Sequence, residues 1–304
     1  MIDANGQAGS SRCNIIMFAG KGGVGKTTCT AAAALHYASS GKQTLAISTD
    51  ATPSLSHIFE IASDRKPARV QGSLYINELG VEEVKVMWDK KFGSEVYGVF
   101  SSFVSVDYAE FVEFVTSILP GLSDEFMVDY IRELSMKGEY ETIVWDTAPL
   151  GQTLTLLETP ALLGKHLRMA PRIYSKLRLG QRSKEPILNI IRRWERLSAE
   201  NMDFLRNRVS FILITIPEAL AVEQLEYVFR ELNKYSLRVK QLIINNLVKA
   251  EESDFLLIKA EQQKKYLEII YNKYPDLQIV ELPMFPREPK GLNRLKEVAD
   301  ILFQ

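Results

Sequence analysis

Short apolar runs alternate along the chain with longer stretches in which apolar residues recur every three or four positions. The short runs predict β-strands at 14–19, 44–48, 74–79, 142–145, 209–214, 239–244 and 278–282. Most of them lack polar alternation, as expected of parallel strands that are buried on both faces. The longer stretches predict helices, among them 27–40, 219–235, 254–274 and 292–303. This alternation predicts an α/β fold with a doubly wound, mostly parallel sheet.

Two stretches, 82–138 and 153–207, interrupt the alternation. Each is too long for the single helix that joins two neighbouring parallel strands, and each has a helical pattern. We interpret them as helical insertions that together form a subdomain beside the sheet. Because no low-complexity tract or linker separates them from the rest of the chain, we expect residues 1–304 to be one domain with two insertions.

A glycine-rich segment follows the first expected strand and precedes the first expected helix. It reads Gly20-Lys21-Gly22-Gly23-Val24-Gly25-Lys26-Thr27, is followed by Thr28, and fits the phosphate-loop pattern G-x-x-x-x-G-K-[ST]. Backbone N–H groups of such a loop and the N-terminus of its helix attract phosphate oxygens. We therefore expect residues 20–28, Thr28 included, to bind ATP, with Lys26 on the β- and γ-phosphates and the Thr27 hydroxyl on Mg²⁺.

The composition restricts the classes of protein to be considered. The chain has 304 residues and a formal net charge of -1, which gives no reason to expect a nucleic-acid partner. Its only two cysteines, Cys13 and Cys29, are too few for a disulfide framework or an iron–sulfur cluster. The sequence has no signal-peptide pattern and no run of about 18 apolar residues. We expect a cytoplasmic protein.

Lys21 places a second lysine at the start of the loop. The sequence Lys-Gly-Gly-Val-Gly-Lys-Thr resembles the deviant Walker A loop of the MinD, ParA, nitrogenase-iron-protein and arsenite-pump ATPases. In these families the early lysine reaches the nucleotide of the partner subunit. The resemblance implies a homodimer with ATP between its subunits, in which Lys21 and Lys26 are catalytic and neutralise charge during γ-phosphate transfer. A solvated lysine is the alternative interpretation of Lys21.

The segment after the second expected strand narrows the resemblance. Ser48-Thr49-Asp50-Ala51-Thr52-Pro53-Ser54-Leu55-Ser56 is similar to the first switch of the arsenite-pump and tail-anchored-protein-targeting ATPases. The resemblance places Asp50 on the catalytic acid that orients and deprotonates the attacking water. The residues at 51–53 replace the family's Pro-Ala-His, so we expect the geometry of this switch to differ. Alternatively, Asp50 is the N-cap of the helix that follows.

A second segment resembles the other switch of this family. It reads Asp146-Thr147-Ala148-Pro149-Leu150-Gly151-Gln152-Thr153-Leu154. Asp146 ends an expected buried strand and corresponds to the acid that holds Mg²⁺ through water. Gln152 stands where the family often has histidine. Pro149 and Gly151 are typical of a loop that senses the γ-phosphate.

Three later segments resemble the nucleotide-recognition segments of the family. The resemblance places the adenine-reading asparagine at Asn245 and the acid that reaches the partner subunit's nucleotide at Glu218. Pro283 and Phe285 lie in a segment that resembles the loop covering the adenine, and both can pack on its ring. One difference is clear: eukaryotic targeting ATPases bind Zn²⁺ with a Cys-x-x-Cys, and the equivalent stretch around 262–267 has no cysteine.

The insertions leave two functional questions open. The aromatic residues between 86 and 119, Phe103 and Phe111 among them, have helical spacing that fits either a core or a groove for a hydrophobic client helix. Residues 165–206 contain eleven Lys or Arg and four Asp or Glu. This surplus fits either a solvated face or contact with an anionic membrane surface or an acidic partner. No nucleic-acid partner is expected, since no module that reads nucleic acid accompanies the charge.

We interpret the chain as a Mg²⁺-dependent ATPase whose ATP-driven dimer closure controls a helical client surface. The resemblance favours a role in targeting tail-anchored membrane proteins. Two alternatives remain: the catalytic ATPase subunit of an anion efflux pump of the arsenite type, and a positioning ATPase of the MinD or ParA type.

Overall fold

The computed structural model describes residues 13–50, 54–62, 67–101, 107–118, 120–148, 150–176, 181–249 and 253–304. The chain forms two compact units. The sheet unit consists of Met1–Leu79, Leu134–Leu154 and Arg208–Gln304. The helical unit consists of Gly80–Glu133 and Thr155–Asn207.

Eight strands of the sheet unit form one sheet. They are β1 (Asn14–Gly20), β2 (Thr44–Ser48), β3 (Ala68–Gln71), β4 (Leu74–Glu78), β5 (Thr142–Asp146), β6 (Val209–Thr215), β7 (Val239–Leu247) and β8 (Gln278–Pro283). Their order is β3-β4-β2-β5-β1-β6-β7-β8, and every neighbouring pair is parallel except β3 with β4. The prediction of an α/β fold with a doubly wound, mostly parallel sheet is confirmed.

The edge strand β3 is the element of the sheet that the apolar pattern does not predict. It has four residues, which alternate between half-buried and exposed positions, and it pairs antiparallel with β4. A short strand that is covered only in part carries no continuous apolar run. The strand β7 also differs from expectation, because it continues to Leu247 instead of ending at residue 244.

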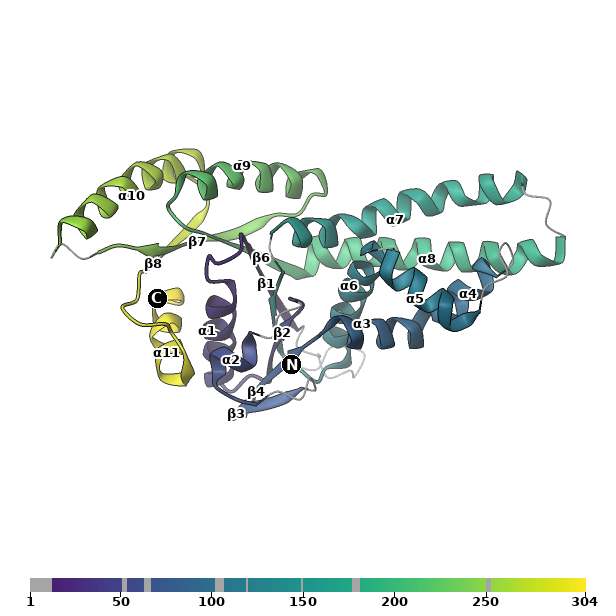
Figure 1. Cartoon of the computed structure of the whole chain (residues 1–304), viewed down its shortest axis with the longest axis horizontal. Helices are drawn as coiled ribbons and strands as arrows, with labels where there is room; N and C mark the ends of the chain where they lie inside the picture. Colours follow the sequence, from purple (N-terminus) through teal and green to yellow (C-terminus); the bar gives the residue numbers. More distant parts are fainter. Residues whose placement is uncertain are drawn as a thin grey trace, which may run out of the picture. The chain divides into compact units, whose positions relative to one another are not determined.

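Helices cover both faces of the sheet (Figure 1). One face is covered by α1 (Lys26–Ser39), α2 (Leu55–Phe59) and α11 (Gly291–Leu302), and the other by α9 (Ala219–Lys234) and α10 (Asp254–Lys273). Four consecutive alanines of α1, Ala31–Ala34, are fully buried, because their small side chains let the helix lie close to the strands. They pack in a core that includes Ile16 and Phe18 of β1 and Ile243 of β7.

The helical unit is built from helices that the structure describes along most of their length. They are α3 (Val81–Trp88), the π-helix η1 (Asp89–Gly93), α4 (Ser94–Phe100), α5 (Tyr108–Ile118), α6 (Pro120–Lys137), α7 (Leu150–Lys176) and α8 (Gln181–Arg208). The last residues of α6 and the first of α7 belong to the sheet unit. None of the helices in the described ranges is apolar over enough of its length to cross a bilayer.

The aromatic residues of the first insertion include core residues. Trp88 is 2% exposed and Phe111 is fully buried. Tyr97 contacts the ring of Phe111 edge to face. Core packing is therefore the observed role of Trp88 and Phe111. Phe103, the other residue considered for a groove, lies outside the described residues.

A buried ion-pair network also connects the helices of this unit. Asp129 of α6 is completely buried and binds Lys91 of η1 and Arg132 of α6, the latter at 2.9 Å. Lys91 also contacts Glu133 at 2.6 Å, and Arg132 donates to the side chain of Asn201 in α8 at 2.8 Å. A buried carboxylate with two cationic partners is costly to separate, so this network holds η1, α6 and α8 together.

Candidate nucleotide site

The candidate site lies at the carboxyl end of the central strand β1. This strand has β5 on one side and β6 on the other, so the chain order reverses beside it. In doubly wound sheets, ligands bind at such a reversal, outside the carboxyl ends of the strands. The loop that joins β1 to α1 is the predicted phosphate loop.

Gly20, Gly23 and Gly25 of this loop have geometry that larger residues do not tolerate. Gly23 and Gly25 have φ values of 78° and 99°, and Gly25 is the N-cap of α1. A Cβ atom on Gly20 would lie 2.4 Å from the carbonyl oxygen of Ile214. The loop therefore turns tightly against β6 and leads directly into the N-terminus of α1. The first turn of α1 carries no acidic residue. This arrangement favours an anion.

Lys26 begins α1 and is 7% exposed. Its ammonium donates a hydrogen bond to the carbonyl of Lys21 at 3.3 Å, within the loop itself. Burial lowers the pKa of Lys26, while the carboxylates of Asp146 and Asp50 act in the opposite direction. The ammonium is therefore held beside the loop with negative charge nearby.

Asp146, at the end of β5, accepts hydrogen bonds on one oxygen. The hydroxyl of Thr27 donates to Oδ2 at 2.8 Å, and that of Ser48 at 3.4 Å. The other oxygen, Oδ1, is buried and has no hydrogen-bond partner in the part of the chain that the structure describes. Burial raises the pKa of Asp146 to about 6, and the hydrogen bond from Thr27 opposes this rise.

A partly unsatisfied carboxylate beside a threonine hydroxyl fits a hydrated Mg²⁺ ion. Mg²⁺ prefers oxygen ligands, keeps several waters, and is usually held by one or two protein groups plus phosphate oxygens. The hydroxyl of Thr27 and the orphaned Oδ1 of Asp146 provide such groups. The residues present therefore fit the ion that the loop implies.

The first switch is held by an acid that was not among the predicted site residues. Oε1 of Glu78, at the end of β4, accepts the backbone N–H groups of Ser54, Leu55 and Ser56 at 2.7, 2.7 and 3.2 Å. The N–H of Asp50 donates to the Ser48 hydroxyl at 3.3 Å. The altered residues at 51–53 lie outside the described residues.

The second switch begins at the end of β5, where a side-chain hydrogen bond holds the chain against β1. Thr147 donates to the carbonyl of Phe18 in β1 at 2.8 Å, and Thr153 donates to the carbonyl of Ala148 at 2.7 Å. Gln152 is exposed, and Pro149 lies outside the described residues. The structure thus fixes both ends of this loop by threonine hydroxyl groups.

The four residues predicted to contact the base or the partner's nucleotide lie in different surroundings. Asn245 is 9% exposed, and its amide donates to the Val24 carbonyl in the phosphate loop at 2.9 Å. Pro283 ends β8, and Phe285 packs against the core on the α1 face of the sheet. Glu218 is exposed and precedes α9. The structure therefore brings Asn245 to the loop, and gives Phe285 contacts within the core.

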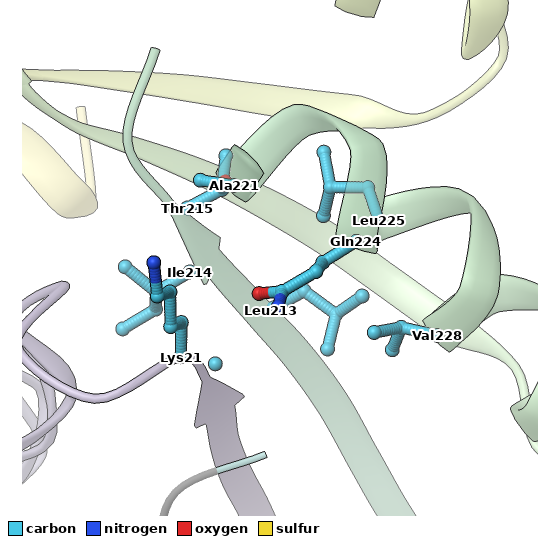
Figure 2. Close-up of a pocket in the computed structure, with 9 residues that line it drawn as sticks. Lys21, Leu213, Ile214, Thr215, Ala221, Gln224, Leu225 and Val228 are labelled. Carbon is cyan, nitrogen blue, oxygen red and sulfur yellow. The ribbon is translucent and has the colours of Figure 1, made fainter. Parts of the chain in front are cut away.

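Lys21 is partly exposed and leaves the loop on the side of β6 (Figure 2). Its side chain runs beside Ile214 on the wall of a small pocket between β6 and α9, which the amide of Gln224 faces from α9. The pocket is lined mainly by apolar side chains, among them Leu213 and Leu225. Among the described residues that line this pocket, Lys21 is the one with a charged side chain.

Sequence reasoning missed Glu78, Ser48 and Ser54 as site residues. A signal for Glu78 exists in the sequence, because a carboxylate at the end of a parallel strand falls at the edge of the sheet where ligands bind. Ser48 and Ser54 fall inside the quoted first switch, yet their contacts to Asp146 and Thr27 depend on the pairing of β2 with β5.

The fold and the loop together define a P-loop nucleotide hydrolase. The chain matches the family model described as anion-transporting ATPase over residues 13–304, and it belongs to this family. It is therefore an ATPase, as the loop and the two switch segments predicted.

Several curated relatives align along nearly the whole chain. The "Putative arsenical pump-driving ATPase 2" of Aquifex aeolicus is 30% identical over 301 residues, which cover 95% of this chain and 98% of that protein. "ATPase GET3A" of Arabidopsis thaliana is 30% identical over 303 residues, which cover 92% of this chain and 81% of that protein. "ATPase ASNA1 homolog 1" of Paramecium tetraurelia is 26% identical over 306 residues, which cover 95% of this chain and 92% of that protein.

Proposed function

We propose that this ATPase acts in the cytoplasm as a Mg²⁺-dependent homodimer that targets tail-anchored membrane proteins. ATP binding closes the two copies, and hydrolysis reopens them. The closure changes how the helical unit presents an apolar surface to a client helix.

The observation that carries this proposal is the way in which the chain enters the helical unit. Glu78 binds the start of α2, and two residues later Gly80 begins the first segment of the helical unit. Leu154 ends the second switch, and Thr155 begins the other segment of the helical unit. Each switch is therefore joined to a segment of the helical unit by very few residues of chain. Ordering of the switches by the γ-phosphate would be passed to the helical unit through these short connections.

The chemistry follows from the side chains around the loop. Lys26 exchanges the Lys21 carbonyl for phosphate oxygens, and Asp50 orients the attacking water and accepts its proton. Thr27 and, through water, Asp146 would hold Mg²⁺, which would supply positive charge beside the phosphate oxygens. Lys21 of each copy neutralises charge at the nucleotide of the other copy.

Binding of a hydrophobic peptide tests the client role. A fluorescent peptide with the sequence of a transmembrane helix should bind tightly with ATP and weakly without nucleotide. Lys26→Ala should abolish this difference, whereas Lys265→Ala, at an exposed position of α10, should preserve it. Peptide affinity that is the same in all nucleotide states would refute the client role.

One observation favours a second candidate, the ATPase subunit of an anion pump. The chain aligns with 98% of a relative named as a putative arsenical pump-driving ATPase. However, Cys13 and Cys29 are both buried, and burial raises the pKa of the Cys13 thiol to about 11 and also raises that of Cys29. Neither offers a thiolate to a metalloid. Turnover that rises on addition of arsenite would favour the pump over targeting.

A further inference from the structure

The end of β7 contains a bulge that places Asn245 against the phosphate loop. Ile244 pairs with Glu281 of β8, whereas Leu247 pairs with Pro283, so β7 has one residue more than β8 between these pairs. Asn246 adopts a left-handed backbone conformation with a φ of 61°. Bulges of this kind redirect a side chain near a site and need support from their surroundings.

Gln263 of α10 supplies that support from the opposite face of the sheet. Its side chain is 5% exposed, its Nε2 donates to the Asn246 carbonyl at 3.0 Å, and its Oε1 accepts from the Val248 N–H at 2.9 Å. One amide thus satisfies a backbone acceptor and a backbone donor on both sides of Leu247. Without Gln263, the Val248 N–H would lose its partner in a buried setting, and the Asn246 carbonyl would lose its partner in a partly buried one.

The contact of Asn245 with the loop fixes a peptide of the nucleotide site. Its Nδ2 donates to the Val24 carbonyl at 2.9 Å. In a planar trans peptide the N–H points opposite to the carbonyl, so this bond also fixes the direction of the Gly25 N–H. The approach is close, because a Cβ atom on Gly25 would lie 2.4 Å from the same Nδ2.

We propose that Gln263 is a positioning residue of the nucleotide site: it fixes the β7 bulge, which directs Asn245 onto Val24 and so holds the phosphate loop in shape for ATP. The proposal rests on the assignment of this loop to ATP, and it is independent of whether Asn245 also reads adenine. It gives α10, a helix in which only Gln263 and Ile270 are buried, a direct connection to the site.

A double-mutant cycle tests the proposal. Gln263→Met removes both hydrogen bonds at similar volume, and Gln262→Met is the matched control at an exposed neighbouring position. We expect Gln263→Met to weaken equilibrium ATP binding roughly tenfold, the effect of losing the hydrogen bond from Asn245 to Val24, with kcat at saturating ATP within about twofold. In an Asn245→Ala background, Gln263→Met should add no further loss.

Amide hydrogen exchange gives a second readout. Gln263→Met should speed exchange in both 242–249 and 20–27, and Asn245→Ala should speed it in 20–27. Gln263→Glu keeps an acceptor for Val248 and provides the measurement if the methionine variant does not fold. Unchanged exchange in 20–27, or an equal loss of ATP affinity in both backgrounds, would overturn the proposal. Unchanged ATP-over-GTP selectivity in Asn245→Ala would refute adenine reading alone.

Discussion

Asp146 has two oxygens in different situations. One accepts hydrogen bonds from the hydroxyl groups of Thr27 and Ser48, and the other is buried without a partner in the described part of the chain. Ionisation of this carboxyl is therefore unfavourable when no cation is bound, which is why its pKa is raised to about 6.

We expect Asp146→Asn to stabilise the nucleotide-free protein at neutral pH. The native pKa of about 6 lies above the ordinary value of 3.8, so the native state binds more protons between these values and its stability falls as pH rises through them. Above pH 6 the cost is about 3 kcal/mol. In urea unfolding with EDTA, the variant should exceed the wild type at pH 7.5 by more than at pH 4.5. A pH-independent difference would contradict this account.

At the scale of elements, the N-terminus of the helix α2 depends on hydrogen bonds to the strand β4. A helix leaves its first N–H groups unsatisfied, and with five residues α2 has few internal bonds to compensate. Glu78 of β4 accepts three N–H groups there, and its other oxygen, Oε2, is buried without a partner among the described residues. The start of α2 is thus attached to β4 through one oxygen of a single carboxylate.

Glu78→Gln should release this attachment. The amide is a weaker acceptor than the carboxylate and adds a donor, so we expect a loss of about 1–2 kcal/mol in the free energy of unfolding. We also expect kcat to fall roughly tenfold, since the start of α2 is part of the switch that carries Asp50. Steady-state turnover and urea unfolding measure both effects, with Glu82→Gln, at an exposed position, as the control. Wild-type kcat in Glu78→Gln would show that the attachment has no part in turnover.

Elements differ in how far the sequence reveals them. The central strands follow from continuous apolar runs, and the loop between β1 and α1 follows from its glycines and Lys26, since both are local patterns. The bulge of β7 and the partners of Glu78 and Gln263 do not, because they depend on pairings between residues far apart in the chain. Sequence reasoning therefore located the loop and its acids and missed the groups that hold them in place.

At the scale of the whole molecule, the assignment of Lys21 makes the dimer testable. Lys21→Ala and Asp50→Asn should each lower turnover strongly, the latter by about 10²–10⁴-fold. A mixture of the two variants should recover activity, because a mixed dimer contains one site with both Asp50 and the partner's Lys21. After free exchange of subunits, about one quarter of all sites should be active. Turnover that stays at the level of the single variants after mixing would exclude a site shared between copies.

The position of β1 in the centre of the sheet also sets the order in which the protein matures during synthesis. The phosphate loop leaves the ribosome early, yet β1 pairs with β5 and β6, and Asn245 reaches the loop from β7. About 220 residues separate Thr27 from Asn245, so at roughly 5–20 residues per second the loop waits about 10–45 s for its neighbours. The strand β5 can pair with β1 once residue 146 has been made, but the other edge of β1 stays unpaired until β6 (Val209–Thr215) has been made. ATP can therefore stabilise the nascent chain only after β7 has been made, near the end of translation.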